Sequence, residues 1–221
     1  MSKADSSPWH EIVARLRVAL DGTDDPSVST VAAEYRDPFR VLISTVISLR
    51  TKDQVTTEAG ARLFSRASTP ASVSALETED IAGLIFPAGF YNTKARNIKD
   101  IARTIAVDFD GVVPRTREAL LELPGVGRKT ANLVLGLGFG VPAICVDTHV
   151  HRIPNRLGLI ATKTPEHTEH ALEASLPHEY WIEINGLLVG FGQRTCTPVS
   201  PWCSTCPLSD LCARVGVERS R

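Results

Sequence analysis

The sequence has no excess of basic residues. Its 221 residues include 24 Lys and Arg against 25 Asp and Glu, which gives a formal net charge of −1 at pH 7. Nucleic-acid-binding domains usually carry a basic surplus, so the overall charge argues against a polyanionic partner. A surplus can still be local, because one face can be basic in a neutral chain. Residues 90–99, for example, contain basic side chains and no acidic one.

Long apolar runs are also missing, and no stretch approaches the roughly 20 apolar residues that cross a bilayer. No membrane partner is therefore expected. The first nine residues lack the basic and apolar regions of a secretory signal, which predicts a cytoplasmic protein, associated with the nucleoid if the source is bacterial. In that compartment the five cysteines are not expected to form disulfides. The length allows one large domain or two small ones with a buried core.

Alternating strand patterns are almost absent, and helical periodicity dominates, which predicts an all-α fold. Between Lys94 and Ile105, an apolar stripe runs through Ile98, Ile101 and Ala102, with Lys94 assigned to a basic outer face. Further helices are predicted at Trp9–Leu20, Pro38–Leu49, Asp53–Ser65, Val73–Leu84, Glu118–Leu123, Lys129–Leu137 and His167–Leu176.

Two glycines one residue apart, Gly125 and Gly127, mark a turn between two of these helices. Their peptide N–H groups and the N-terminus of the next helix can form an anion site for a phosphate. A nucleic-acid backbone would be bound there without readout of its sequence. An ordinary helix–turn–helix connection would show the same pattern.

Lys129 lies in the first turn of the second helix. The positive end of the helix dipole and partial burial favour an uncharged amine there, and an uncharged amine is a nucleophile that forms Schiff bases. The alternatives are a second phosphate contact or a solvated charge.

Asp147 directly follows the apolar run 143–146 and is expected to be partly desolvated. It can cap the following helix, and it can also stabilise a cation or accept a proton. His149 and His151 are two residues apart and do not share a helical face, so polar packing or phosphate contacts are favoured over a metal pair. Cys145 is interpreted as a buried small hydrophobic residue.

The other four cysteines lie within seventeen residues and are separated by six, two and five residues: Cys196, Cys203, Cys206 and Cys212. Such a group in a cytoplasmic chain indicates a thiolate-bound metal centre. The spacing contains only one C-x₂-C pair and differs from the common ferredoxin patterns, so it leaves zinc and iron–sulfur open.

Together these motifs resemble the endonuclease III family of the helix–hairpin–helix DNA glycosylase superfamily. The resemblance extends from about Pro38 to Cys212 and rests on Leu123-Pro-Gly-Val-Gly-Arg-Lys-Thr-Ala131, Val146-Asp-Thr-His-Val-His-Arg152 and the cysteine spacing. Segments 47–53 and 89–95 resemble the two DNA-probing loops of the family. Arg50 is a departure, because many relatives carry glutamine at this position, and Phe90 stands where the family has a leucine wedge.

The resemblance implies a two-lobed fold. Residues 31–141 would form a six-helix barrel with the helix–hairpin–helix, and residues 1–30 with 142–221 an iron–sulfur cluster domain holding a [4Fe–4S] cluster. Lys129 would attack the sugar, Asp147 would assist, and the partner would be double-stranded DNA with a damaged pyrimidine or an abasic site, bound by a monomer. The implied DNA contacts are Arg50, Phe90, Leu123, Gly125, Val126, Gly127, Arg128, His149 and Arg194.

The implied activity is that of a bifunctional glycosylase and abasic-site lyase that removes oxidised pyrimidines. Adenine-removing relatives lack the lysine at 129, and relatives acting on oxidised guanine usually lack the cysteines. One alternative is a monofunctional glycosylase for uracil or thymine in mismatches. Another is a non-enzymatic DNA-binding protein with a metal cluster.

Overall fold

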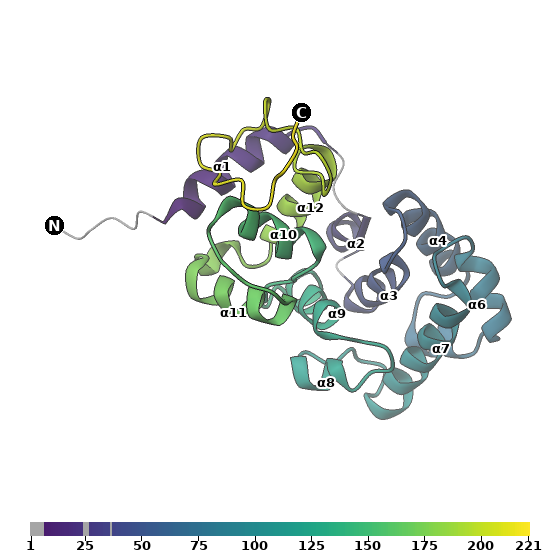
Figure 1. Ribbon diagram of the computed structural model, residues 1–221. Helices are drawn as coiled ribbons and strands as arrows, with labels where there is room; N and C mark the ends of the chain where they lie inside the picture. The colour runs from purple at the N-terminus through teal and green to yellow at the C-terminus, as the bar shows by residue number, and fades with distance from the viewer. Residues whose placement is uncertain (1–6, 24–26, 36) are drawn as a thin grey trace. The chain divides into compact units, whose positions relative to one another are not determined.

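The computed structural model describes residues 7–23, 27–35 and 37–221, and every regular element in that part of the chain is a helix. The all-α prediction is confirmed. The elements, labelled as in Figure 1, are α1 Pro8–Leu20, α2 Ser27–Tyr35, α3 Pro38–Ser48, α4 Asp53–Arg66, α5 Pro70–Ser74, α6 Thr78–Ile85, α7 Tyr91–Asp108, α8 Arg117–Leu121, α9 Arg128–Leu133, the π-helix η1 Val134–Gly138, α10 Thr148–Leu157, α11 Pro165–Ser175, the 3₁₀ helix η2 His178–Tyr180 and α12 Ile184–Arg194. None of these helices combines the length and apolarity that a membrane crossing needs.

The chain divides into two compact units, one of residues Met1–Asp25 with Pro142–Arg221 and the other of Pro26–Val141. This division differs from the expected boundary at residue 31, which falls inside α2. Because α2 packs against α3, α2 belongs with the helices that follow it. Residues 1–6 and 24–26 of the expected N-terminal segment lie outside the described residues.

The Pro26–Val141 unit is built around α3. Asp37 caps this helix by accepting a hydrogen bond from the Phe39 amide at 2.9 Å, and Pro38 occupies its first turn. From Val41 to Ile47 every side chain is buried, including those of Ser44 and Thr45, so this helix is enclosed on all sides by the rest of the unit. Helices α2, α4, α7 and α9 and the π-helix η1 all pack against it.

The other unit has its core between α1, α10 and α12, where Trp9, Leu16 and Phe191 are buried. Helix α12 was not predicted, because three glycines lower its intrinsic helix propensity. Close packing explains two of them. A Cβ on Gly190 would lie 3.3 Å from both methyl groups of Leu20, and a Cβ on Gly192 would overlap the His149 ring. Tertiary contacts thus override local propensity here.

Three helix predictions need correction. The single helix expected at 73–84 is two helices, α5 and α6, and α5 begins at a capping box between Thr69 and Ser72. The helix expected at 129–137 changes at Val134 into a π-helix. Lys94 is 5 % exposed and does not lie on an outer face.

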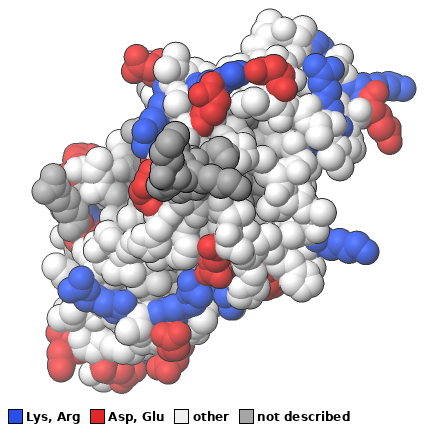
Figure 2. All heavy atoms as spheres, turned by 90° about the vertical axis from the view of Figure 1, so that its left-hand side faces the viewer, with Lys and Arg blue, Asp and Glu red and all other residues white. Residues whose placement is uncertain are grey.

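Charges of both signs are mixed on the face drawn in Figure 2, where blue and red side chains stand in small adjacent groups. The near-neutral composition is therefore repeated locally on this face, which carries no large field of one sign.

Candidate active site and cysteine cluster

The glycine turn between α8 and α9 presents its backbone outward and its apolar side chains inward. Leu123 and Val126 are buried, and the Val126 amide donates to the Leu123 carbonyl at 3.1 Å. Gly125 and Gly127 are exposed. Leu123 and Val126 therefore anchor the turn, and any contact they make with a ligand is through their backbone.

Glycine occurs at positions 125 and 127 for different structural reasons. Gly125 has a φ of +74°, which favours glycine, and a Cβ there would lie 2.5 Å from Nδ2 of Asn97. Gly127 has an extended backbone with φ −102° and ψ 177°, and a Cβ there would meet nothing within 4 Å. The backbone conformation and the contact with Asn97 favour glycine at 125, whereas nothing within the protein favours it at 127. At 127 the missing side chain leaves room for an external group to approach the backbone.

Lys129 lies in the first turn of α9, directly after this turn, and its side chain is half-buried, as is that of Arg128. The following residues, Thr130 to Leu133, are buried, so the part of α9 that follows the lysine is packed into the protein. The wider π-helical turn of η1 comes next, a feature that often marks functional sites.

Asp147 is the N-cap of α10, which confirms the predicted capping role. Its Oδ1 accepts hydrogen bonds from the amides of His149 and Val150, both at 2.8 Å. Both bonds end on the same oxygen, so they fix the orientation of the carboxylate, while Oδ2 takes no part in the cap. The side chain is half-buried at the end of the buried run Ala143–Val146.

The two histidines of this motif face different partners. Nδ1 of His151 lies 2.6 Å from Oγ1 of the buried Thr168, and Nδ1 of His149 lies 3.3 Å from Nη2 of Arg152. His151 is therefore packed against a polar side chain.

Cys145 is 2 % exposed, as predicted. Arg194 is exposed at the last residue of α12.

Arg50 and Phe90, the residues expected to probe DNA, lie in two adjacent loops of the Pro26–Val141 unit. Both are exposed, and both have a left-handed backbone, with φ of 53° and 58°. The Arg50 guanidinium lies over the Phe90 ring, 5.6 Å from its centroid, within the range of a cation–π contact.

All four clustered cysteines line one cavity in the unit that contains α10 and α12, together with Arg156, Phe191, Trp202 and Arg214. None of the five cysteines, all of which lie in the described part of the chain, is in a disulfide. Within residues 7–23, 27–35 and 37–221, no three His, Cys, Asp or Glu side chains are grouped to hold a single metal ion.

Hydrogen-bond donors point at three of these sulfurs. Nη1 of Arg156 is 3.4 Å from Sγ of Cys196, the Leu208 amide is 3.4 Å from Sγ of Cys206, and the Arg214 amide is 3.3 Å from Sγ of Cys212. N–H groups directed at thiolate sulfurs are typical of iron–sulfur sites. In the thiol form, burial raises the pKa of both Cys206 and Cys212.

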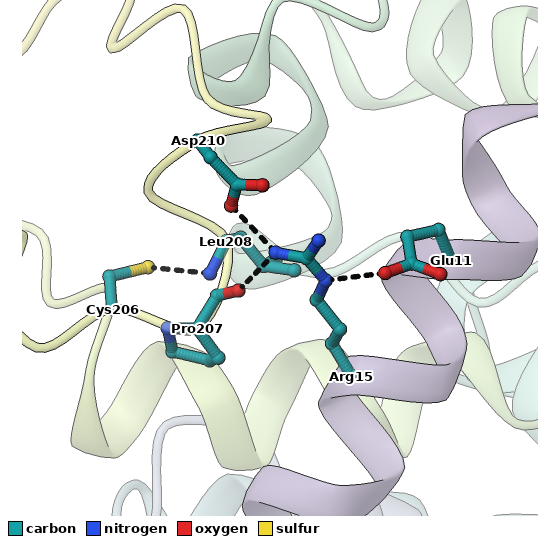
Figure 3. Close-up of polar contacts among 6 residues, drawn as sticks. All are labelled: Glu11, Arg15, Cys206, Pro207, Leu208 and Asp210. Carbon is teal, nitrogen blue, oxygen red and sulfur yellow. Dashed lines mark hydrogen bonds and ion pairs between the residues drawn. The ribbon is translucent and has the colours of Figure 1, made fainter.

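Two arginines that hold the cysteine loops were missed from the sequence. Arg156 also donates to the carbonyls of Thr197 at 2.9 Å and Pro198 at 3.1 Å. Arg15 of α1 donates to the Pro207 carbonyl at 3.0 Å and to Asp210 at 2.6 Å, and it lies beside Cys206 (Figure 3). The position of Arg156 four residues after Arg152, on one face of α10, was an available signal. Nothing local in the sequence marks Arg15.

Comparison with known proteins identifies the family. The model of the HhH-GPD superfamily of base excision DNA repair proteins matches residues 43–178. Endonuclease III of Thermotoga maritima is 51 % identical over 176 residues, covering 80 % of this chain and 83 % of that protein.

Two solved structures agree with this assignment. A trapped covalent intermediate of endonuclease III with DNA has a TM-score of 0.81 and 35 % identity, covering 93 % of this chain and 95 % of that one. A thermostable thymine-DNA glycosylase has a TM-score of 0.79 and 28 % identity, with the same coverage. The chain belongs to the endonuclease III family of the HhH-GPD superfamily and is a DNA glycosylase and abasic-site lyase of base excision repair.

Proposed function

We propose that this enzyme removes oxidised pyrimidines, such as thymine glycol and hydroxylated cytosine, from double-stranded DNA as a monomer and then cleaves the strand by β-elimination. The observation that carries the proposal is the position of Lys129, half-buried in the first turn of α9 and directly after an outward-facing glycine turn. A backbone-binding turn next to a lysine would bring a deoxyribose and an amine together.

Lys129 is the proposed nucleophile. Its Nζ forms a bond to C1′ of the sugar, and the bond from C1′ to the base breaks with its electron pair leaving on the base, which is then protonated. The nitrogen then loses one proton and its lone pair forms the C1′=N bond, while the C1′–O4′ bond breaks and O4′ is protonated, which gives a protonated imine. Removal of a C2′ proton forms a C2′=C3′ double bond as the C3′–O bond breaks and the 3′-phosphate leaves, which cleaves the strand.

Asp147 is the proposed partner in this chemistry. Its carboxylate is held by the amides of His149 and Val150 on Oδ1 alone, at 2.8 Å each. A carboxylate held in this way stabilises positive charge on the sugar and accepts protons from the lysine without having to reorganise.

The DNA contacts divide into two kinds. The turn amides of Gly125 and Gly127, with Arg128, His149 and Arg194, are proposed to hold phosphates, which positions the duplex without reading its sequence. Arg50 and Phe90 are proposed to enter the stack where the damaged nucleotide leaves it, because a base inside the duplex is out of reach of the lysine.

Cys196, Cys203, Cys206 and Cys212 are proposed to hold a [4Fe–4S] cluster, and the unit containing them would be the cluster domain. The support is that all four line one cavity and that N–H donors already point at three of their sulfurs. The cluster would supply cross-linking and charge that fix the surrounding loops, including the end of α12 with Arg194.

The test is incision of a panel of duplexes by the purified protein. Thymine glycol and 5-hydroxycytosine duplexes should be cleaved, and borohydride should trap a covalent adduct with each. Base release from G·U or G·T mismatches without an adduct would instead support the mismatch glycosylase. A protein with no turnover on any duplex, no iron–sulfur absorption in the visible range and bound zinc would overturn the proposal.

A further inference from the structure

Lys94, in the first turn of α7, points into the protein and bonds to the end of another helix. Its Nζ donates to the carbonyls of Ile47 at 2.6 Å and Leu49 at 2.5 Å, and to Oγ1 of Thr51 at 2.8 Å. The carbonyls of Ile47 and Leu49 lie at the C-terminal end of α3, where intrahelical donors run out and the helix dipole favours a cation. The lysine therefore caps α3 from outside that helix.

The same contacts tie together two loops. We name residues 49–52 the Arg50 loop and residues 86–90 the Phe90 loop. Oγ1 of Thr51, which accepts from Lys94, also accepts from the Gly89 amide at 3.0 Å. A Cβ on Gly89 would lie 2.5 Å from the Arg50 carbonyl oxygen, so the two loops meet backbone to backbone.

The Phe90 loop is also held by a residue of another helix. Arg62 of α4 donates to the carbonyl of Leu84 at 2.8 Å and to that of Phe86. At the exposed tips of the two loops the side chains are also in contact, with the Arg50 guanidinium over the Phe90 ring. The buried parts of the two loops are thus held together by hydrogen bonds, and the Lys94 amine is at the centre of these bonds.

A buried ammonium is expensive unless its donors are satisfied, so an apolar side chain would serve simple packing better at this position. Lys94 is 5 % exposed and bonds to three acceptors that belong to the Arg50 loop or to the helix turn directly before it. The hydrogen bonds of Lys94 therefore fix the segment that carries Arg50, which an apolar side chain at this position could not do.

We propose that Lys94 is a positioning residue that joins the Arg50 loop and the Phe90 loop, so that Arg50 and Phe90 enter the duplex together as one rigid unit. This rests on the proposed function, in which both residues occupy the space around an extruded nucleotide. Lys94 itself touches no reacting atom. Its effect is on how well the duplex is held open, while the lysine chemistry at position 129 is unchanged.

The experiment uses a duplex with a tetrahydrofuran abasic analogue placed opposite 2-aminopurine. The analogue cannot react, and the fluorescence of 2-aminopurine rises when it loses its stacking. With the wild-type protein at saturation, the fluorescence should rise. Lys94→Met should give a rise at least about twofold smaller, because loops that enter separately hold the bases apart less well. The variant should also slow excision from a thymine glycol duplex by on the order of 10- to 100-fold.

A matched control is Lys99→Met, the same substitution in α7 at a lysine that pairs with Glu77 at 3.2 Å on the surface. It should keep the wild-type fluorescence rise. If Lys94→Met fails to fold by circular dichroism, Thr51→Val decides, because it keeps the lysine and removes the hydroxyl that accepts from both Lys94 and Gly89.

A folded Lys94→Met or Thr51→Val variant with the wild-type fluorescence rise would overturn this inference. Failure of the proposed function has a different signature. The wild-type protein itself would then neither excise thymine glycol nor form a borohydride adduct, whatever the fluorescence of the unreactive duplex.

Discussion

The Arg50 guanidinium lies over the Phe90 ring at 5.6 Å from its centroid, so the two residues expected to probe DNA are partners before DNA arrives. Both stand in left-handed backbone conformations, which are uncommon for residues other than glycine. Such local strain is characteristic of functional loops. A cation over an aromatic face also restricts both side chains, which lowers the entropy lost when they enter a duplex.

Replacement of Phe90 tests its role as a wedge. Phe90 is 64 % exposed, so Phe90→Ala should change the free energy of unfolding by less than about 0.5 kcal/mol. Excision from a thymine glycol duplex should fall by on the order of 10- to 100-fold, because unstacking costs a few kcal/mol per step and would no longer be offset. Single-turnover kinetics measure the loss.

Phe90→Leu is the matched control, since it keeps an apolar side chain of similar reach. It should retain most of the wild-type rate. Equal losses in Phe90→Ala and Phe90→Leu would show that the ring is needed for something other than its apolar bulk.

Replacement by alanine should destabilise the protein at one of the two turn glycines and leave its stability unchanged at the other. Gly125→Ala places a Cβ 2.5 Å from Asn97 at a φ of +74°, so it should destabilise the protein by about 1–3 kcal/mol. Gly127→Ala meets nothing within 4 Å and should leave stability within about 0.5 kcal/mol. Urea denaturation measures both.

If Gly127 is glycine to let a phosphate approach, Gly127→Ala should weaken binding to an abasic-analogue duplex although the protein is as stable as the wild type. Unchanged affinity in that variant would remove the turn from the DNA contacts.

Asp147→Asn separates the capping role from the chemical role. Asparagine caps helices about as well as aspartate, so the amides of His149 and Val150 keep their acceptor and stability should change by less than about 1 kcal/mol. Loss of the negative charge should lower the single-turnover excision rate by on the order of 10²- to 10³-fold. A wild-type rate in Asp147→Asn would limit this residue to capping α10.

Sequence patterns predicted the parts of the site that depend on local chemistry. The Asp147 cap follows from a carboxylate just before a helix, and the buried Cys145 from its apolar neighbours. The four cysteines were predicted to form one site because they lie close together in the sequence, and in the structure all four line one cavity. The glycine turn likewise lies where expected, between α8 and α9.

The predictions were wrong or incomplete where tertiary contacts, and not residue type, determine where a side chain lies. Lys94 lies four residues before Ile98, so helical periodicity itself puts it on the buried face of α7, and only its charge argued for an outer position. Its acceptors come from another helix, which no local pattern reveals. The glycine-rich α12 and the loop contacts of Arg15 were missed for the same reason.

Burial lowers the pKa of Lys94 to about 8, and this predicts how stability depends on pH. Between about pH 8 and the ordinary lysine value of 10.5, the folded state has lost this proton and the unfolded state still binds it. The free energy of unfolding therefore gains a contribution that rises with pH in this window, by up to about 1.4 kcal/mol per unit.

The measurement is urea denaturation of the wild-type protein and Lys94→Met at pH 7.5 and pH 9.5. The free energy of unfolding of the wild type minus that of the variant should increase with pH. Taking this difference cancels the titration of the other groups, which both proteins share. A difference that stays constant or decreases would show that Lys94 does not titrate in this window.

The most direct test of the account is to locate the covalent bond formed during catalysis. A thymine glycol duplex is reacted with the wild-type enzyme in the presence of borohydride, and the digested adduct is sequenced by mass spectrometry. Lys94 is a useful internal comparison, because burial lowers its pKa to about 8, yet its Nζ is bonded within the protein. The account predicts the reduced sugar on Lys129 and no adduct in Lys129→Gln. A reduced sugar on any other amine, or full trapping by Lys129→Gln, would contradict it.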